Sequence, residues 1–216
     1  MMTLPIGITQ QAAGGGVVTT YVNDTFTDTD TTAIASHTPD TDAVGGGWIV
    51  DSGGLTISSN ALLPSTMTGV DACRIDAGQS DCVITVSSTT EYIDNSNYAN
   101  PAIFVHVDSG GTTGYSVYLS PAFSTAHLAI YGFVEATLLD QEDTIPEINN
   151  IDNVSYTLVV TVSGSTITGV LTVGGNDYTV TNASCTNNTS DTHYSIRHQG
   201  VGTYTKRAFD NFSITA

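Results

Sequence analysis

The strongest constraint on the fold is a period-two alternation of apolar and small polar residues over 156–180. One face of this segment begins with four larger side chains, Tyr156, Leu158, Val160 and Val162. Gly164 and the run 174–177, which reads Gly-Gly-Asn-Asp, interrupt the alternation, and it resumes after each. Period two is typical of a strand with one buried face, and Gly, Asn and Asp are typical of hairpin turns. The segment therefore predicts three antiparallel strands in a meander.

The same alternation recurs in four other places, Val83–Val86, Ile103–Val107, Tyr115–Leu119 and Leu128–Phe133. About a dozen short strands at this spacing predict an all-β sandwich or barrel. The best helical candidate is Phe133–Asp143, where Leu138, Leu139 and Glu142 suggest one or two turns before Pro146. Within 21–216 no linker divides the chain, so we expect a single domain.

The charge balance excludes several classes of partner. The chain has 216 residues, 21 acidic and 4 basic, with a net charge of −17. The basic residues are Arg74, Arg197, Lys206 and Arg207. So few cations cannot follow a phosphate backbone or hold an anionic membrane, so we expect no nucleic-acid and no membrane partner. Apolar stretches such as Ala102–Val105 are also far shorter than a membrane-spanning helix requires.

Residues 1–20 have no structural period and are predicted to form an extended arm. The arm is free of charge and includes four apolar residues, Leu4, Pro5, Ile6 and Ile8, ahead of a glycine run. Met1–Ile6 has no positive charge and 7–13 is polar, so the segment lacks the features of a secretory signal. Such an arm can become ordered by lying on a neighbouring subunit.

Three cysteines, Cys73, Cys82 and Cys185, are an odd number, which argues against a disulfide framework. Cys73 and Cys82 could pair across a hairpin in an oxidising compartment. We favour the alternative that all three are small buried thiols. Their spacing is too wide for a cysteine metal site.

Two segments carry a resemblance to a known family. The first is Asn23-Asp24-Thr25-Phe26-Thr27-Asp28-Thr29-Asp30, continued by Ile34, His37-Thr38-Pro39-Asp40, Gly47-Trp48 and Ile57-Ser58-Ser59-Asn60-Ala61-Leu62. The second is the closing segment Phe209-Asp210-Asn211-Phe212-Ser213-Ile214. Together they resemble the laminin-G-like branch of the concanavalin A-like lectin/glucanase superfamily, as found in tailed-bacteriophage virion proteins.

The resemblance implies a two-sheet antiparallel jelly-roll sandwich over 21–216, in which the first strand pairs with the last. It implies an aromatic contribution to the sheet interface from Phe26, Trp48, Phe209 and Phe212. It also makes Asp24 and Asp210 the candidates for a structural Ca²⁺ site, because related sandwiches often hold Ca²⁺ where the end strands meet. The alternative, which we slightly favour, is that both carboxylates bond local backbone amides.

We expect no enzymatic activity. The glucanases of this superfamily carry a Glu-x-Asp-x-x-Glu strand, because retaining hydrolysis needs two carboxylates close together. The four glutamates of this chain, Glu91, Glu135, Glu142 and Glu147, do not form that pattern. Polysaccharide lyases instead need a basic cluster with a Tyr or His base, and the candidate cluster for that chemistry spans 193–198. Strand alternation divides it, because it puts His193 and Arg197 on one face and Tyr194 and His198 on the other.

A glycan site needs exposed aromatic rings beside amide or carboxylate groups. Tyr92, Asn95, Asn97 and Tyr98 share one loop-like stretch and are the candidates. The alternative is that they are ordinary loop residues of an Asn-rich surface. His106 and His127 are better explained as core or sheet-face residues than as ligands.

These observations favour a non-enzymatic bacteriophage virion structural protein, specifically a capsid decoration or cement protein attached through its N-terminal arm. Its expected partners are the major capsid protein or other virion subunits, with a possible homo-oligomer, on the surface of a virion assembled in the host cytoplasm. The alternative is a carbohydrate-binding module or a tail-fibre or receptor-binding adhesin that recognises surface glycans, either on the virion or in an extracellular setting. No cofactor other than the candidate Ca²⁺ is expected.

Overall fold

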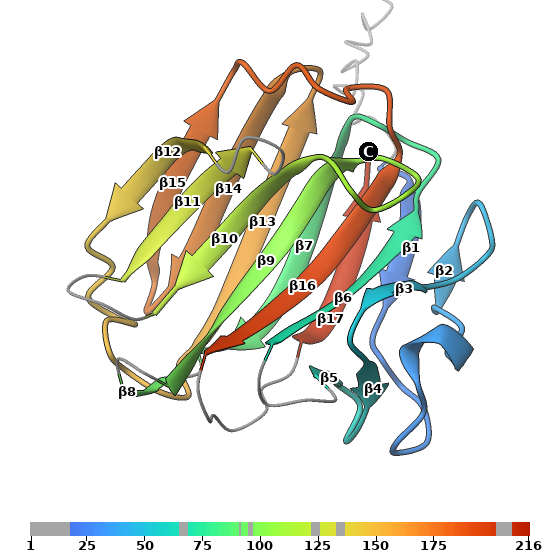
Figure 1. Ribbon diagram of the computed structural model, residues 1–216, viewed down its shortest axis with the longest axis horizontal. Helices are drawn as coiled ribbons and strands as arrows, with labels where there is room; N and C mark the ends of the chain where they lie inside the picture. The colour runs from blue at the N-terminus through green and yellow to red at the C-terminus, as the bar shows by residue number, and fades with distance from the viewer. Residues whose placement is uncertain are drawn as a thin grey trace, which may run out of the picture.

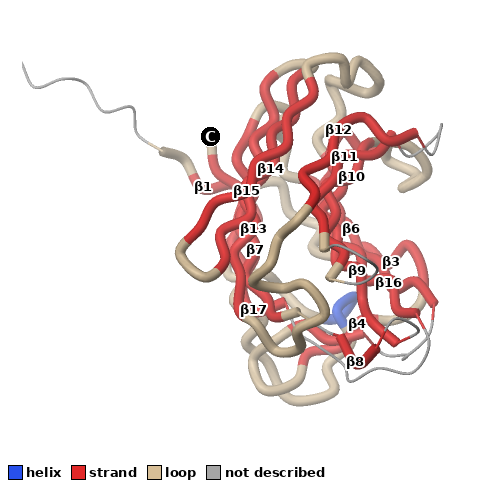
Figure 2. Tube along the Cα trace, turned by 90° about the vertical axis from the view of Figure 1, so that its left-hand side faces the viewer, coloured by secondary structure: helices blue, strands red, loops and turns tan. Residues whose placement is uncertain are grey.

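The protein is a sandwich of two antiparallel sheets, seen face-on in Figure 1 and edge-on in Figure 2. The computed structural model describes residues 18–64, 69–90, 92–94, 97–121, 126–132, 137–201 and 209–216. Within these ranges the one helical element is a single 3₁₀ turn, η1 (Ile34–Ser36). None of the described helical structure is long and apolar enough to span a membrane.

Sheet A has the strand order β15-β14-β13-β7-β17-β1-β2, and β5 pairs with both β17 and β4. Its strands are β1 (Thr20–Asp24), β2 (Thr41–Asp42), β4 (Leu55–Ile57), β5 (Leu62–Pro64), β7 (Cys82–Thr89), β13 (Ser155–Ser163), β14 (Thr166–Val173), β15 (Asn176–Asn182) and β17 (Phe209–Thr215). The first and last strands therefore lie side by side inside the sheet, with Asn23 opposite Ser213. This pairing leaves neither terminal strand as an open edge.

Sheet B has the strand order β12-β11-β10-β9-β16-β6-β3, and β8 pairs with β9. Its strands are β3 (Ile49–Ser52), β6 (Gly69–Asp76), β8 (Tyr92–Asp94), β9 (Asn97–Val107), β10 (Tyr115–Ser120), β11 (His127–Gly132), β12 (Thr137–Asp143) and β16 (His193–Val201). The long strand β16 runs between β9 and β6, so a segment near the C-terminus lies at the centre of this sheet (Figure 1).

The expected meander is confirmed as β13-β14-β15, with Leu158 opposite Leu171 and Gly169 opposite Val180. The prediction of a helix over 133–143 is wrong for the part of this segment that the structure describes. Residues 137–143 form β12, which pairs with β11 along the sheet. The physical reason is that β11 presents unpaired backbone groups, and a strand satisfies them where one or two isolated helical turns cannot.

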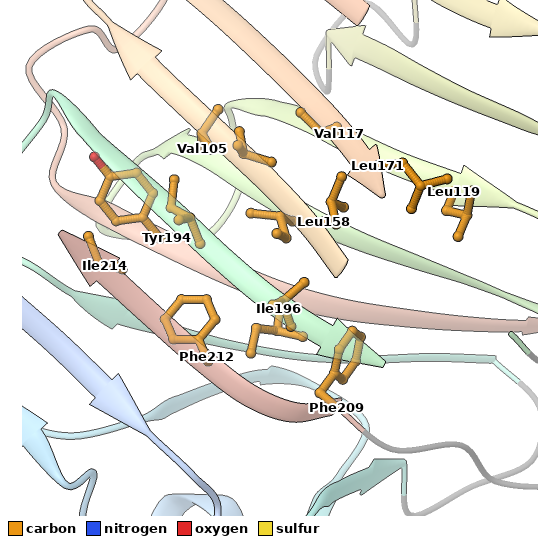
Figure 3. Close-up of a cluster of buried hydrophobic side chains, with 14 of the residues drawn as sticks. Val105, Val117, Leu119, Leu158, Leu171, Tyr194, Ile196, Phe209, Phe212 and Ile214 are labelled. Atoms are coloured by element: carbon orange, nitrogen blue, oxygen red, sulfur yellow. The ribbon is translucent and has the colours of Figure 1, made fainter. Parts of the chain in front are cut away.

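The core lies between the sheets and combines residues from both (Figure 3). In sheet A, Phe209, Phe212 and Ile214 of β17 point inward, and in sheet B Tyr194 and Ile196 of β16 do so. The four aromatic residues expected at the interface, Phe26, Trp48, Phe209 and Phe212, are all buried. The ring centroids of Trp48 and Phe212 are 5.2 Å apart in an edge-on arrangement. Burial of each such side chain contributes a few kcal/mol.

Gly169 marks a point of close approach between the two sheets. A Cβ atom at this position would lie 2.6 Å from Cγ1 of Val117, which belongs to β10 in the opposite sheet. It would also lie 3.2 Å from Cγ2 of Val180 on the neighbouring strand. Val117 is fully buried and cannot move aside. The glycine is therefore required by packing between the sheets and not by backbone conformation.

We expect Gly169→Ala to lower the free energy of unfolding by about 1–3 kcal/mol, because the added methyl group overpacks the sheet interface. Urea denaturation followed by circular dichroism measures the change. Thr161→Ala, on the exposed face of the adjacent strand, is the control and should change stability by no more than about 0.5 kcal/mol. A Gly169→Ala variant as stable as the wild type would contradict this packing.

Candidate functional site

The outward face of sheet B carries a groove formed by two adjacent pockets. The residues at its centre come from three neighbouring strands, and β16 and β10 both flank β9. The first pocket is lined by Asp51, Ser52, Val70, Ala72, Phe104, Val107, Gly111, Thr113, Ser195 and Arg197. The second is lined by Asn100, Ala102, Phe104, Ser116, Tyr118, Tyr131, Gly132, Arg197 and Gln199. Phe104 and Arg197 belong to both pockets, so the two form one continuous groove.

Strand register explains why these side chains meet. Across the β16–β9 pair, Arg197 lies opposite Ala102 and Gln199 lies opposite Asn100. Across the β9–β10 pair, Ala102 lies opposite Tyr118. Residues opposite one another in an antiparallel pair point to the same face. The intervening residues, such as Ile103 and Ile196, point into the core.

Aromatic rings form one part of the groove. The ring centroids of Tyr118 and Tyr131 are 5.4 Å apart and meet edge to face. The Tyr118 hydroxyl lies 2.6 Å from Nε2 of His127, which fixes the ring at its outer end. Both tyrosines are half-buried, and Phe104 between them and Arg197 is buried. The groove thus offers fixed aromatic surface in contact with solvent.

Arg197 occupies the middle of the groove. Its guanidinium carbon lies 5.4 Å from the centroid of the Phe104 ring, within the range of a cation–π contact. Burial lowers the pKa of Arg197 from its ordinary value. An arginine remains protonated under all ordinary conditions, so the groove contains a partly desolvated positive charge.

An ion pair between Arg74 and Asp51 borders the first pocket. Gly111 packs against this pair, since a Cβ atom there would lie 2.6 Å from Nη1 of Arg74 and 2.8 Å from Oδ1 of Asp51. The loop that contains Gly111 is held by Asp108, which accepts hydrogen bonds from the backbone amides of Thr112 and Thr113. Burial opposes ionisation of Asp108, but these hydrogen bonds outweigh it and lower its pKa to about 2.

The two carboxylates considered for Ca²⁺ lie in different surroundings. Asp24 is fully buried, and its oxygens accept hydrogen bonds from the Phe26 amide at 2.7 Å and from Nε1 of Trp48 at 2.7 Å, with Nε2 of His37 at 2.9 Å. Asp210 is exposed, at an irregularity of the β7–β17 pairing. Among the described residues, no group of three or more His, Cys, Asp or Glu side chains is arranged to hold a metal ion. The Asp24 contacts match the alternative in which the carboxylate bonds a local amide.

The loop-like stretch considered for glycan binding lies at one end of sheet B. Tyr92 is half-buried in β8, and its backbone pairs with Tyr98 of β9. Asn97 and Tyr98 begin β9, the strand that carries Asn100 into the groove. Asn95 lies outside the described residues, as do Leu4, Pro5, Ile6 and Ile8 of the arm. The candidate stretch thus leads along β9 into the groove.

The cluster at 193–198 is divided as its alternation predicts. Tyr194 points into the core and donates its hydroxyl to the backbone carbonyls of Gln79 and Ser80. Arg197 points into the groove. The groove as a whole was not predictable from local sequence, because its residues come from segments up to about 150 positions apart. The nearest signal was the polar–apolar alternation of β9, β10 and β16.

All three cysteines are buried and unbridged, as the favoured interpretation expected. Burial raises the pKa of the Cys82 and Cys185 thiols to about 11. They are therefore protonated at neutral pH and unreactive. Cys73 lies in β6 of sheet B and Cys82 in β7 of sheet A, so no single hairpin joins them.

Comparison with known proteins identifies the fold. No protein-family model matches the sequence, and no curated protein does. Among solved structures, the carbohydrate-binding module CBM2 of the evolved Dit protein of Lactobacillus casei BL23 phage J-1 is similar, with a TM-score of 0.61 and 12% identity over 92% of this chain and 95% of that chain. A Bauhinia forficata lectin in complex with GalNAc is similar at a TM-score of 0.56 and 12% identity, and the match covers 78% of this chain and 91% of the lectin chain. An endo-1,3-β-glucanase from Streptomyces sioyaensis is similar at a TM-score of 0.52 and 12% identity, and the match covers 94% of this chain and 98% of the glucanase chain.

These likenesses establish the fold as the concanavalin A-like jelly roll, as the sequence resemblance implied. At 12% identity they define the architecture alone. Both binding proteins and a hydrolase occur among the similar structures, so the chemistry must be argued from the side chains of this chain.

The network around Asp24 generates a pH-dependent prediction. Burial works against a charged His37, but hydrogen bonds to Asp24 and Asp28 outweigh it and raise the pKa of His37. Protonated His37 therefore adds stability that is fully present below its unfolded pKa of about 6.5 and is lost as pH rises through the raised value. Burial lowers the pKa of His106, so this residue changes the pH dependence of stability in the opposite direction.

Because His37 and His106 affect the pH dependence of stability in opposite directions, the contribution of His37 is measured as the difference in melting temperature between the wild type and His37→Asn. We expect the difference to be greatest below pH 6.5 and to shrink at higher pH. Asp28→Asn, which removes one of the two carboxylate partners, should leave an intermediate profile. A difference that stays constant from pH 5 to pH 9 would show that His37 does not titrate in this network.

Proposed function

We propose that this protein is a carbohydrate-binding domain of a bacteriophage virion, and that it binds glycans in the groove of sheet B. The observation that carries this proposal is the convergence of Phe104, Tyr118 and Tyr131 with Arg197 and polar side chains on one solvent-facing surface. Sugars present apolar ring faces that stack on aromatic side chains, and hydroxyl groups that need hydrogen-bond partners. The groove offers both kinds of contact over neighbouring strands.

The polar lining includes a group that suits a ligand hydroxyl. Oδ1 of Asn100 is buried and has no hydrogen-bond partner among the described residues. A buried acceptor without a partner is costly, and a ligand that donates to it recovers this cost. Ser116 and Gln199 line the same pocket and add further hydrogen-bonding groups.

The composition of the groove supports binding over hydrolysis. Retaining and inverting glycosidases both use a pair of carboxyl groups on either side of the scissile bond. The lining residues described for the two pockets include one carboxylate, Asp51, and it is paired with Arg74. We therefore propose that a bound glycan is held without being cleaved.

The proposal of a phage virion rests on the sequence resemblance, and a phage carbohydrate-binding module with the same fold supports it. Within the virion, we propose that the arm of residues 1–20 attaches the domain of residues 21–216 to the particle. Capsid decoration, through the major capsid protein, is the specific form of attachment that we propose. A tail-associated adhesin is the alternative. In either case we propose that the groove meets host glycans.

We expect Tyr131→Ala to weaken binding to a glycan ligand at least about tenfold, because it removes the aromatic surface on which a sugar ring stacks. Screening of a glycan array identifies the ligand, and calorimetric titration measures the affinity. Tyr92→Ala is the matched control, since it removes a tyrosine from the neighbouring loop-like stretch. Loss of binding in Tyr92→Ala alone would move the site to 92–98.

A second prediction concerns the arm. Removal of residues 1–17 leaves the paired Thr19 and Thr20 in place, so the domain should fold and retain its glycan affinity. The same truncation should abolish co-sedimentation with purified phage particles. Retained co-sedimentation would contradict attachment through the arm.

A further inference from the structure

We infer that His106 is a positioning residue for the groove. Its buried neutral ring holds a bulge in β9 that turns Val107 and the following loop, residues 108–114, toward the first pocket, and acid releases this arrangement. The first pocket is the part of the groove that His106 shapes, so the inference rests on the proposed function and names a residue outside the lining that controls it.

Strand β9 changes the face that its side chains occupy between Phe104 and Val107. These two residues belong to one apolar cluster, and both line the first pocket. Residues three positions apart in a regular strand point to opposite faces. The pairing with β16 contains the extra residue, because Phe104 lies opposite Ser195 and Val107 lies opposite His193. One residue more is used on β9 than on β16, which is the definition of a β-bulge.

The backbone places the extra residue at His106. Its φ is +52°, a left-handed value that few residues other than glycine adopt. Val105 and His106 are both fully buried, so two successive residues leave the outward face before Val107 returns to it. A backbone conformation of this kind persists only where the surrounding contacts compensate for its strain.

The His106 ring makes contacts that provide this compensation. Its Nε2 lies 3.0 Å from the carbonyl oxygen of Gly164, in the turn between β13 and β14 of sheet A. The ring also meets the Tyr115 ring of β10 edge to face, with 6.3 Å between centroids. Asp81 holds the same turn by accepting a hydrogen bond from the Gly164 amide at 2.8 Å. The ring thus joins a bulge of sheet B to a fixed turn of sheet A.

The bulge sets the position of the loop that follows β9. This loop supplies Gly111 and Thr113 to the lining of the first pocket. It returns to β10 directly beside the bulge, since a Cβ atom at Gly114 would lie 3.1 Å from the carbonyl oxygen of His106. A change in the backbone at His106 therefore reaches the pocket by two routes, through Val107 and through the loop.

The ring fits this position only in its neutral form. A carbonyl oxygen can only accept a hydrogen bond, so Nε2 carries the hydrogen and Nδ1 is the basic nitrogen. Nδ1 is buried and has no hydrogen-bond partner among the described residues. Burial lowers the pKa of His106, although the Gly164 carbonyl and the carboxylates of Asp81 and Asp191 act in the opposite direction. Tyr115 is a further titratable group that faces the ring. Protonation would place a charge away from water, which is costly.

Acid should therefore undo the arrangement. Neutral His106 contributes stability that is present above its unfolded pKa of about 6.5 and is lost as pH falls from that value toward the lowered pKa of the folded protein. Glycan affinity then falls with the fraction of molecules that keep the pocket in place. His193 of β16 lies opposite Val107 and is a second histidine near the pocket, so the test compares proteins that differ only at position 106.

Nuclear magnetic resonance of the full chain tests the positioning without a ligand. In a titration from pH 7.5 to pH 4.0, Nδ1 of His106 should be unprotonated at the start and become protonated below pH 6.5. The backbone amide signals of Gly111 and Thr113 should move together with this protonation, while those of β15 stay in place. Signals of Gly111 and Thr113 that do not follow the His106 ring would overturn the inference.

Variants assign the effect to the ring. His106→Gln can still donate an amide hydrogen to the Gly164 carbonyl and does not titrate, so the loop signals should keep their pH 7.5 positions down to pH 4.0. His106→Ala removes the contact and should shift these signals at every pH. Val105→Ala is the matched control, since it removes a buried side chain of the same strand and should lower the melting temperature without shifting the loop signals. Equal shifts in Val105→Ala and His106→Ala would reduce His106 to a general structural role and overturn the inference.

Neutral oligosaccharides on the glycan array connect the bulge to binding, because their own charge does not change with pH. Between pH 7.5 and pH 4.5 the wild type should lose at least about fivefold in affinity for the neutral oligosaccharide that it binds best, and His106→Gln should lose less than about twofold. Equal losses in the two proteins would overturn the inference and leave the proposed function intact. Failure to bind any glycan at pH 7.5 would contradict the proposed function, while the resonance titration would still decide whether His106 positions the loop.

Discussion

The rest of the structure depends on the buried carboxylate of Asp24. A charge without solvent is tolerated only when donors surround it, and Trp48, His37 and the Phe26 amide meet this need. These contacts tie the end of β1 to the long connection that follows it. They also hold Phe26 at a φ of +51°, which is uncommon for an aromatic residue. With Trp48 fixed, its ring packs on Phe212 of the last strand and joins the two ends of the chain in one core.

This closed core gives sheet B the support that the groove requires. The inward residues of β9, β10 and β16 pack against sheet A, so the outward residues of the same strands are held in fixed positions. Phe104, Tyr118 and Arg197 therefore form their surface on rigid strands, where a site needs little reorganisation to bind a ligand. Strand register also brings Arg197 over the ring of Phe104.

Much of the fold was predictable because it depends on local pattern. Alternation over 156–180 predicted the β13–β15 meander, and the resemblance carried by the opening and closing segments implied the aromatic interface. The helix expected at 133–143 failed where it is described because an available sheet edge outweighed a weak local preference. The site was harder to predict. The stretch around Tyr92 and Tyr98 was visible as a loop-like cluster, whereas the groove beside it draws alternate residues from several separate strands.

The sequence alone determined the all-β class and which residues of each strand share a face. Those properties depend on composition and on the two-residue period of a strand. Tertiary structure decided which strands are neighbours, because pairing between β16 and both β9 and β6 is set by the packing of the whole sandwich. Only that pairing puts Arg197 between Phe104 and Asn100. An alternating pattern specifies the face on which a side chain lies, and it does not specify the side chains beside it.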